Sequence, residues 1–151
     1  MHTITRKNIF ESGMQTLVNP VNCVGVMGAG LALAFKNKYP DMFSTYCMAC
    51  RENRIRPGKP FYFFEEESNT GILLFPTKDH WRNPSKLEYI EKGLDNFIEN
   101  YHNWGITSIA FPALGCGYGG LETNIVIPLM VEKLKTTDIP VKICLPSSKI
   151  K

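Results

Sequence analysis

Short apolar runs alternate along the chain with longer segments whose apolar residues recur at helical spacing. Runs rich in β-branched or aromatic residues predict six strands, over residues 2–6, 16–19, 61–64, 71–76, 107–111 and 140–145. Helical spacing is clearest over residues 87–101, after a Pro84-Ser85 start. Three more helices are expected directly after Gly30, from Pro40 onward and over residues 122–135. This alternation predicts an α/β fold with a largely parallel or mixed sheet.

Composition is that of one globular domain. The chain has 151 residues, of which 44% are hydrophobic and 21% charged. No apolar stretch approaches the roughly 20 residues of a membrane span, and the first ten residues lack the apolar segment of a secretory signal. Five cysteines, an odd number, favour free thiols in a reducing compartment. We expect a single domain over residues 1–151, soluble, cytoplasmic and without membrane attachment.

Two glycine-rich loops each follow a predicted strand and precede a predicted helix. The first covers residues 19–30, and the second is "FPALGCGYGGL", residues 111–121. In α/β sheets, ligands bind at the carboxyl ends of strands, where helix N-termini point N–H groups and positive dipole ends outward. Glycine lets the backbone approach an anion closely. The two loops therefore predict a phosphate-binding clamp, with ordinary tight turns as the alternative.

Two common nucleotide sites are disfavoured. A Walker A loop places Gly-Lys-Ser/Thr at the helix start, whereas Gly30 is followed by Leu-Ala-Leu. The spacing of Gly25, Gly28 and Gly30 does not fit a Rossmann fingerprint either. The net charge of +3 permits an anionic partner without indicating nucleic acid by itself.

Four segments together resemble a known family. They are "LVNPVNCVGVMGAGLALAF", "YPDMFSTYCMACRENRIRPGK", "FPTKDHWRNPSKLEYIEKGL" and "IAFPALGCGYGGL". Their content and order resemble macrodomains, which bind ADP-ribose, and most of all those of the DarG type, which remove ADP-ribose from DNA. The resemblance runs from about residue 2 to residue 145. It implies a three-layer α/β/α macrodomain with a central mixed, largely six-stranded sheet.

The resemblance also implies which residues contact ADP-ribose. Asn22 would lie beside the distal ribose, the first loop would wrap that ribose and the phosphates, and the second loop would offer N–H groups to the diphosphate. The implied ligand-binding residues are Asn8, Ile9, Asn19, Gly25, Val26, Met27, Gly28, Gly30, Pro76, Thr77, Leu114, Gly115, Cys116, Gly117, Tyr118 and Gly119.

Lys78 falls on the lysine that looks catalytic in DarG-type enzymes, and Asn22 is the second residue assigned to catalysis. Lys78 ends a strand-like run, where its amine could steer, protonate or attack the anomeric carbon of the ribose. Without the resemblance, a solvated lysine beside a turn would be the favoured explanation of the position. His80 and Trp81 follow on the same loop and are candidate contacts for a released nucleobase, with simple loop packing as the alternative.

Two positions depart from the family pattern. Macrodomains usually carry an aspartate that accepts from the adenine amino group, and Asn8 stands there, so we expect a weaker contact. Enzymes that act on ADP-ribose phosphates resemble this chain in that asparagine. Gly119 replaces the acidic residue of the human terminal glycohydrolase type, which leaves Glu122 as the nearest carboxylate.

Two further motifs carry a weaker signal. Cys47-x-x-Cys50 has redox or half-zinc spacing, but both cysteines share an apolar helix face with Phe43 and Tyr46. The basic segment 51–59, "RENRIRPGK", could contact a DNA backbone or be a solvated turn after a helix.

The function that the resemblance implies is removal of ADP-ribose from a modified DNA base, without metal or cofactor. The expected partners are ADP-ribosylated DNA, single-stranded rather than duplex, and a cognate DarT-like toxin, with the chain a monomer. The alternatives are a reader that binds ADP-ribose without turnover, an ADP-ribose-1″-phosphate phosphatase and a protein mono-ADP-ribosyl hydrolase. The sequence leaves open whether the acceptor is thymidine, guanosine or a protein side chain, and whether the chain is one domain of a longer antitoxin.

Overall fold

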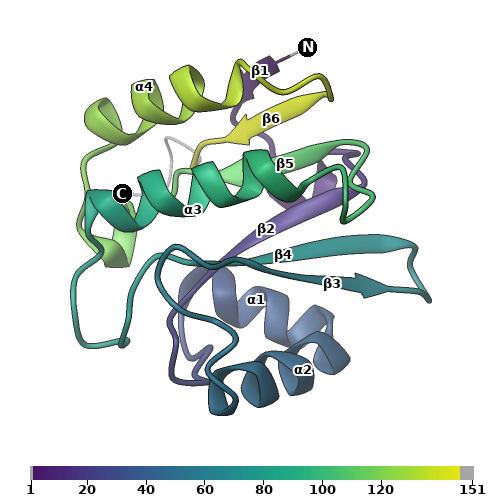
Figure 1. Ribbon diagram of the computed structural model, residues 1–151, viewed down its shortest axis with the longest axis vertical. Coiled ribbons are helices and arrows are strands. Elements are labelled where there is room, and N and C mark those ends of the chain that lie inside the picture. The colour runs from purple at the N-terminus through teal and green to yellow at the C-terminus, as the bar shows by residue number, and fades with distance from the viewer. Residues whose placement is uncertain (1, 147–151) are drawn as a thin grey trace.

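The computed structural model describes residues 2–146 and contains one six-stranded sheet (Figure 1). The strand order is β1-β6-β5-β2-β4-β3. All neighbouring strands are parallel except β3 and β4, which form an antiparallel pair. The strands are β1 (His2–Thr5), β2 (Thr16–Val21), β3 (Phe61–Glu65), β4 (Thr70–Pro76), β5 (Ile109–Pro112) and β6 (Val141–Cys144).

Helices cover both faces of the sheet. Figure 1 shows α3 and α4 together on one face and α1 and α2 together on the other. The helices are α1 (Gly30–Lys38), α2 (Pro40–Arg51), α3 (Leu87–Asn100) and α4 (Thr123–Leu134). The predicted three-layer α/β/α fold with a mixed six-stranded sheet is therefore confirmed.

The alternation of side chains along the central strands creates two cores. In β4, Leu73 and Phe75 pack toward α3 and α4, whereas Ile72 and Leu74 pack toward α1 and α2. Successive residues of a strand point to opposite faces, and both faces of a parallel sheet are covered by helices. This explains why β4 is a continuous apolar run.

The element boundaries differ from the predictions in a few places. Strand β5 begins at Ile109, two residues later than expected. Helix α3 begins at Leu87, and Ser85 is buried instead of capping its start. Two 3-10 turns, Ile9–Glu11 and Gly117–Gly119, were not predicted, because such short turns leave no periodic pattern in the sequence.

The topology determines where a ligand site can lie. Because β2, β4, β5 and β6 are parallel, their carboxyl ends reach the same edge of the sheet. Both glycine loops leave the sheet at that edge, after β2 and after β5. Within residues 2–146, no helix is long and apolar enough to cross a membrane.

Candidate functional site

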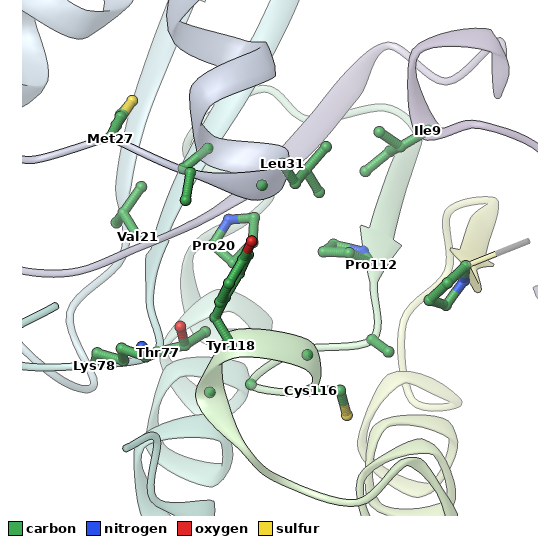
Figure 2. Close-up of a pocket in the computed structure, with 18 of the residues that line it drawn as sticks. Ile9, Pro20, Val21, Met27, Leu31, Thr77, Lys78, Pro112, Cys116 and Tyr118 are labelled. Atoms are coloured by element: carbon green, nitrogen blue, oxygen red, sulfur yellow. The ribbon is translucent and has the colours of Figure 1, made fainter. Parts of the chain in front are cut away.

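A cavity of about 1190 Å³ opens at the carboxyl edge of the sheet (Figure 2). Its lining comes from the residues that end or follow β2, β4, β5 and β6, from the start of α1 and from residues 6–9. The volume is slightly above the range of about 300–1000 Å³ that is usual for small-molecule pockets. The two glycine loops lie on opposite sides of the opening.

Most of the predicted site residues are brought together by the fold. Those that line the cavity are Asn8, Ile9, Asn22, Val26, Met27, Gly28, Gly30, Thr77, Lys78, Trp81, Gly115, Cys116, Gly117, Tyr118 and Gly119. In the described part of the chain, five others lie outside the lining: Asn19, Gly25, Pro76, Leu114 and His80.

Asn19 is the clearest of these exceptions. It lies in β2 and is fully buried, with its amide nitrogen 3.7 and 3.8 Å from the sulfur atoms of Met27 and Met42. Its side-chain oxygen has no partner within residues 2–146. The side chain therefore packs behind the first loop instead of facing a ligand.

Asn22 organises the first loop. Its amide nitrogen donates to the carbonyl of Val26 at 2.8 Å, and its side-chain oxygen accepts from the N–H of Val24 at 3.0 Å. The Tyr46 hydroxyl, which is buried on α2, lies 2.6 Å from the same oxygen. Burial raises the pKa of Tyr46, so the hydroxyl remains a donor. One N–H of the Asn22 amide stays available for a ligand.

The second loop ends in a 3-10 turn at the cavity wall. The first N–H groups of such a turn, here those of residues 117–119, have no partner within the turn and are available to an anion. Behind the turn lies Ser85, whose N–H donates to the carbonyl of Gly119 at 2.9 Å. A Cβ on Gly119 would clash with the Ser85 hydroxyl, so a larger residue here would displace Ser85 or the turn.

Tyr118 connects the two loops across the cavity. Its ring lies 3.0 Å from the position that a Cβ would take on Gly30, the first residue of α1. Figure 2 shows the ring standing in the cavity between the two loops. The side chain is nevertheless 78% exposed. Tyr118 therefore forms part of the cavity mouth and faces solvent.

Lys78 follows β4 and is held by its own loop. Its Nζ donates to the carbonyl of Trp81 at 3.3 Å. Cys23 of the first loop donates its N–H to the carbonyl of Asp79 at 3.2 Å, and its thiol lies 3.4 Å from the carbonyl of Lys78. These contacts fix the lysine loop against the loop that contains Asn22.

The turn after Lys78 is closed by local hydrogen bonds. Asn83 donates to the carboxylate of Asp79 at 2.9 Å, which lowers the pKa of Asp79. The N–H of Arg82 donates to Nδ1 of His80 at 3.1 Å. The Trp81 ring is 47% exposed at the cavity mouth, while His80 lies outside the lining with its ring centre 5.3 Å from that of Trp81.

The cysteines near the cavity are poor nucleophiles. Burial, with a smaller contribution from Cys50, raises the pKa of Cys23 to about 12. Burial also raises the pKa values of Cys116 and Cys144, which both line the cavity. Thiols are nucleophilic as thiolates, so these groups stay unreactive near neutral pH. The lining then offers two amines, those of Lys7 and Lys78, and Lys78 is the one whose loop is bonded to the loop that contains Asn22.

Two other predicted features lie apart from the cavity. Glu122 is exposed at the start of α4 and does not belong to the lining as described for residues 2–146. Cys47 and Cys50 are half-buried free thiols on α2. In the described chain, no three His, Cys, Asp or Glu side chains are grouped to hold a metal.

Sequence reasoning missed several residues of the site. Tyr46 and Ser85 support the two loops from behind, and the apolar spacing of α2 gave no sign that the Tyr46 hydroxyl reaches Asn22. The unassigned lining residues are Arg6, Lys7, Pro20, Val21, Ala29, Leu31, Ala32, Pro112, Ala113, Cys144, Leu145 and Pro146. Two signals were available: the place of residues 144–146 at a strand end, and the place of Pro20, Val21, Ala29, Pro112 and Ala113 inside the two predicted loops.

These features define a class: α/β/α domains with a ligand cavity between two glycine loops at the carboxyl edge of a mixed sheet. The chain belongs to the Macro domain family, which matches residues 18–130. The resemblance recognised in the sequence is confirmed, because solved DarG macrodomains share the fold at substantial identity.

Three relatives illustrate the similarity. The macrodomain of Thermus aquaticus DarG is 38% identical with a TM-score of 0.91, and the alignment covers 97% of this chain and 99% of that one. Thermosipho africanus DarTG, solved in complex with ADP-ribose, is 47% identical with a TM-score of 0.89 over 92% of this chain and 40% of that one. A Thermosipho africanus protein named DNA ADP-ribosyl transferase-DNA ADP-ribosyl glycohydrolase fusion protein is 43% identical over 97% of this chain. The chain spans 42% of the length of that relative.

Proposed function

We propose that the chain is an ADP-ribosyl glycohydrolase that removes ADP-ribose from a modified DNA base. The observation that carries the proposal is the position of Lys78, which lines one side of the cavity between the two loops. The name of the fusion relative and the ADP-ribose complex of Thermosipho africanus DarTG support the same reaction and ligand. A reader domain has no use for a reactive amine at this position.

The cavity suits an extended ligand with a diphosphate at its centre. Figure 2 shows Ile9 and Lys78 on opposite sides of the cavity, with Tyr118 between them. The adenine would lie beside Asn8 and Ile9, and the distal ribose beside Asn22 and Lys78. The N-terminus of α1 and the N–H groups of the 3-10 turn would bind the diphosphate, because both present a positive dipole end.

The chemistry requires cleavage of the bond between the anomeric carbon of the distal ribose and the acceptor nitrogen. The base leaves with the electron pair of that bond and takes up a proton, and water adds to the carbon. Lys78 supplies the reactive group: its amine attacks the carbon before water does, or its ammonium group donates the proton to the base. Backbone dipoles hold the diphosphate throughout, so binding does not depend on a metal ion.

The proposed partners follow from the reaction. The substrate is DNA that carries ADP-ribose, and the enzyme that adds the group is a DarT-like DNA ADP-ribosyl transferase. We propose that the chain acts as a monomer, because all elements of the cavity come from one chain.

The test is incubation of the protein with a single-stranded oligonucleotide that carries ADP-ribose on a base. We expect release of free ADP-ribose and the unmodified strand by wild type and by Lys38→Ala, an exposed control on α1. In Lys78→Ala, the rate of ADP-ribose release should fall at least 100-fold, while the dissociation constant for ADP-ribose should stay within a few-fold of the wild-type value.

Other outcomes identify the alternatives. Tight ADP-ribose binding without release by any variant would indicate a reader. Release of phosphate from ADP-ribose-1″-phosphate with the sugar intact would indicate a phosphatase. Release from an ADP-ribosylated protein but not from DNA would indicate a protein acceptor, and each of these results would overturn the proposal.

A further inference from the structure

The positive charge of the chain is concentrated in two segments. Residues 51–59 and 78–92 contain eight of the 17 Lys and Arg residues but four of the 14 Asp and Glu residues. The rest of the chain therefore has one more acidic than basic residue. The net charge of the chain is small, but its basic residues are distributed unevenly.

The fold brings these two segments side by side. A Cβ on Gly58 would lie 3.1 Å from the Cβ of Lys92, so the turn after α2 packs directly against α3. Cys23, whose N–H donates to the carbonyl of Asp79, is close enough to both Asp79 and Arg56 for their charges to act on its thiol.

Four basic side chains of this surface are exposed and form what we call the basic edge: Arg56, Lys59, Arg82 and Lys86. Their neighbours Arg54 and Lys92 form salt bridges with Glu52 and Glu88. Within residues 2–146, no salt bridge involves any residue of the basic edge. These four charges therefore have no carboxylate within salt-bridge distance in the described chain, although Lys86 is close enough to Asp79 to help lower the pKa of that carboxyl.

An exposed aromatic ring joins the basic edge to the cavity. Trp81 lines the cavity mouth and is also half exposed, and the guanidinium of Arg82 lies 4.9 Å from its ring centre. The Lys78 amine is bound to the carbonyl of this same residue. The indole ring therefore belongs to the residue that holds the Lys78 amine, at the mouth of the cavity.

We infer that the basic edge and Trp81 together bind a strand of single-stranded nucleic acid, with phosphates on the basic edge and an unpaired base on the indole ring. The inference rests on the proposed function, which gives the reason to expect a nucleic-acid ligand. The exposed charges and the exposed indole ring do not depend on that function. Lys and Arg side chains along a strand neutralise phosphates, and an aromatic ring stacks on a base that is not already stacked in a duplex.

The test measures binding of an unmodified, fluorescein-labelled single-stranded oligonucleotide by anisotropy, so that no hydrolysis is needed. Arg56→Glu/Lys59→Glu and Arg82→Glu/Lys86→Glu should each weaken binding by about tenfold or more. Each should also make the plot of log K against log salt concentration less steep by about 1.4, for two lost phosphate contacts. Trp81→Ala should weaken binding by about fivefold or more, and Trp81→Phe should restore most of it.

The matched control is Lys38→Glu/Lys135→Glu, which changes the net charge equally at exposed sites on α1 and after α4. Its dissociation constant for the oligonucleotide should be within twofold of the wild-type value. The dissociation constant for free ADP-ribose should stay within twofold in all double variants, which also shows that they fold.

Three results would overturn the inference: no strand binding by wild type at low salt, equal losses in the control, or preference for duplex over single strand. Failure of the proposed function would look different, because strand binding would follow the expected pattern while no variant released ADP-ribose from modified DNA.

Discussion

The hydroxyl of Tyr46 lies 2.6 Å from the side-chain oxygen of Asn22 and 2.9 Å from its backbone carbonyl. Through this contact a buried residue of α2 determines the shape of the loop that we assign to the distal ribose. Asn22 could not hold Val24 and Val26 in place if its own amide were free to rotate.

Tyr46→Phe should reduce the free energy of unfolding by about 1 kcal/mol and weaken ADP-ribose binding several-fold, because Asn22 loses a buried donor. Urea denaturation and calorimetry measure the two effects. Tyr62→Phe is the matched control, because the Tyr62 hydroxyl accepts from Gln15 away from the cavity. An affinity unchanged in Tyr46→Phe would mean that the loop keeps its shape without the hydroxyl.

Gly119→Ala should weaken ADP-ribose binding by at least tenfold, because the new Cβ would clash with the Ser85 hydroxyl and displace the 3-10 turn. Ser85→Ala removes that oxygen and should restore part of the affinity in the double variant. On its own, Ser85→Ala should leave stability nearly unchanged, because this buried hydroxyl has no partner in the described chain. If the double variant binds no better than Gly119→Ala, the clash is not the cause of the loss.

Asn8→Asp should bind ADP-ribose about fivefold more tightly than wild type, since a charged acceptor strengthens the hydrogen bond to the adenine amino group. The side-chain oxygen of Asn8 already accepts from the N–H of Phe10 at 2.8 Å, and aspartate can keep that contact. Asn8→Ala should lose both contacts and bind more weakly. Calorimetry with ADP-ribose and with ribose-5-phosphate, which has no adenine, isolates the contribution of adenine to the affinity. An equal increase in affinity for both ligands would contradict the contact between residue 8 and adenine.

The stability of the protein should fall as the pH rises from about 9 to about 12, in part because of Cys23. Its pKa is raised from 9.0 to about 12 in the folded protein, mainly by burial. Above pH 9 the unfolded chain releases the thiol proton and the folded chain does not, so alkaline conditions favour unfolding. Cys23→Ala should show a shallower decline in urea denaturation at pH 9 to 10.5. In the folded protein, the Cys23 thiol should also react slowly with iodoacetamide at pH 8. Rapid alkylation of Cys23 would contradict its raised pKa.

Much of the fold could be predicted because it depends on local patterns. The six strands and four helices follow from alternating apolar runs and helical spacing, and Pro40 marks the start of α2 correctly. The two glycine loops were recognisable because each lies between a strand and a helix. The 3-10 turns were not, because such short turns leave no periodic pattern, and the exact start of β5 was not, because it depends on pairing with β2 and β6.

For the site, the sequence by itself determined that two glycine loops and Lys78 lie at the carboxyl ends of strands. Only the tertiary structure decided that Asn19 turns away from the cavity, that Tyr46 and Ser85 support the loops from behind, and that the basic segment after α2 packs against α3. The physical reason is that strand order and helix packing bring together residues dozens of positions apart. Local propensity and spacing describe each segment, whereas the side-chain contacts between segments exist only once the sheet has assembled.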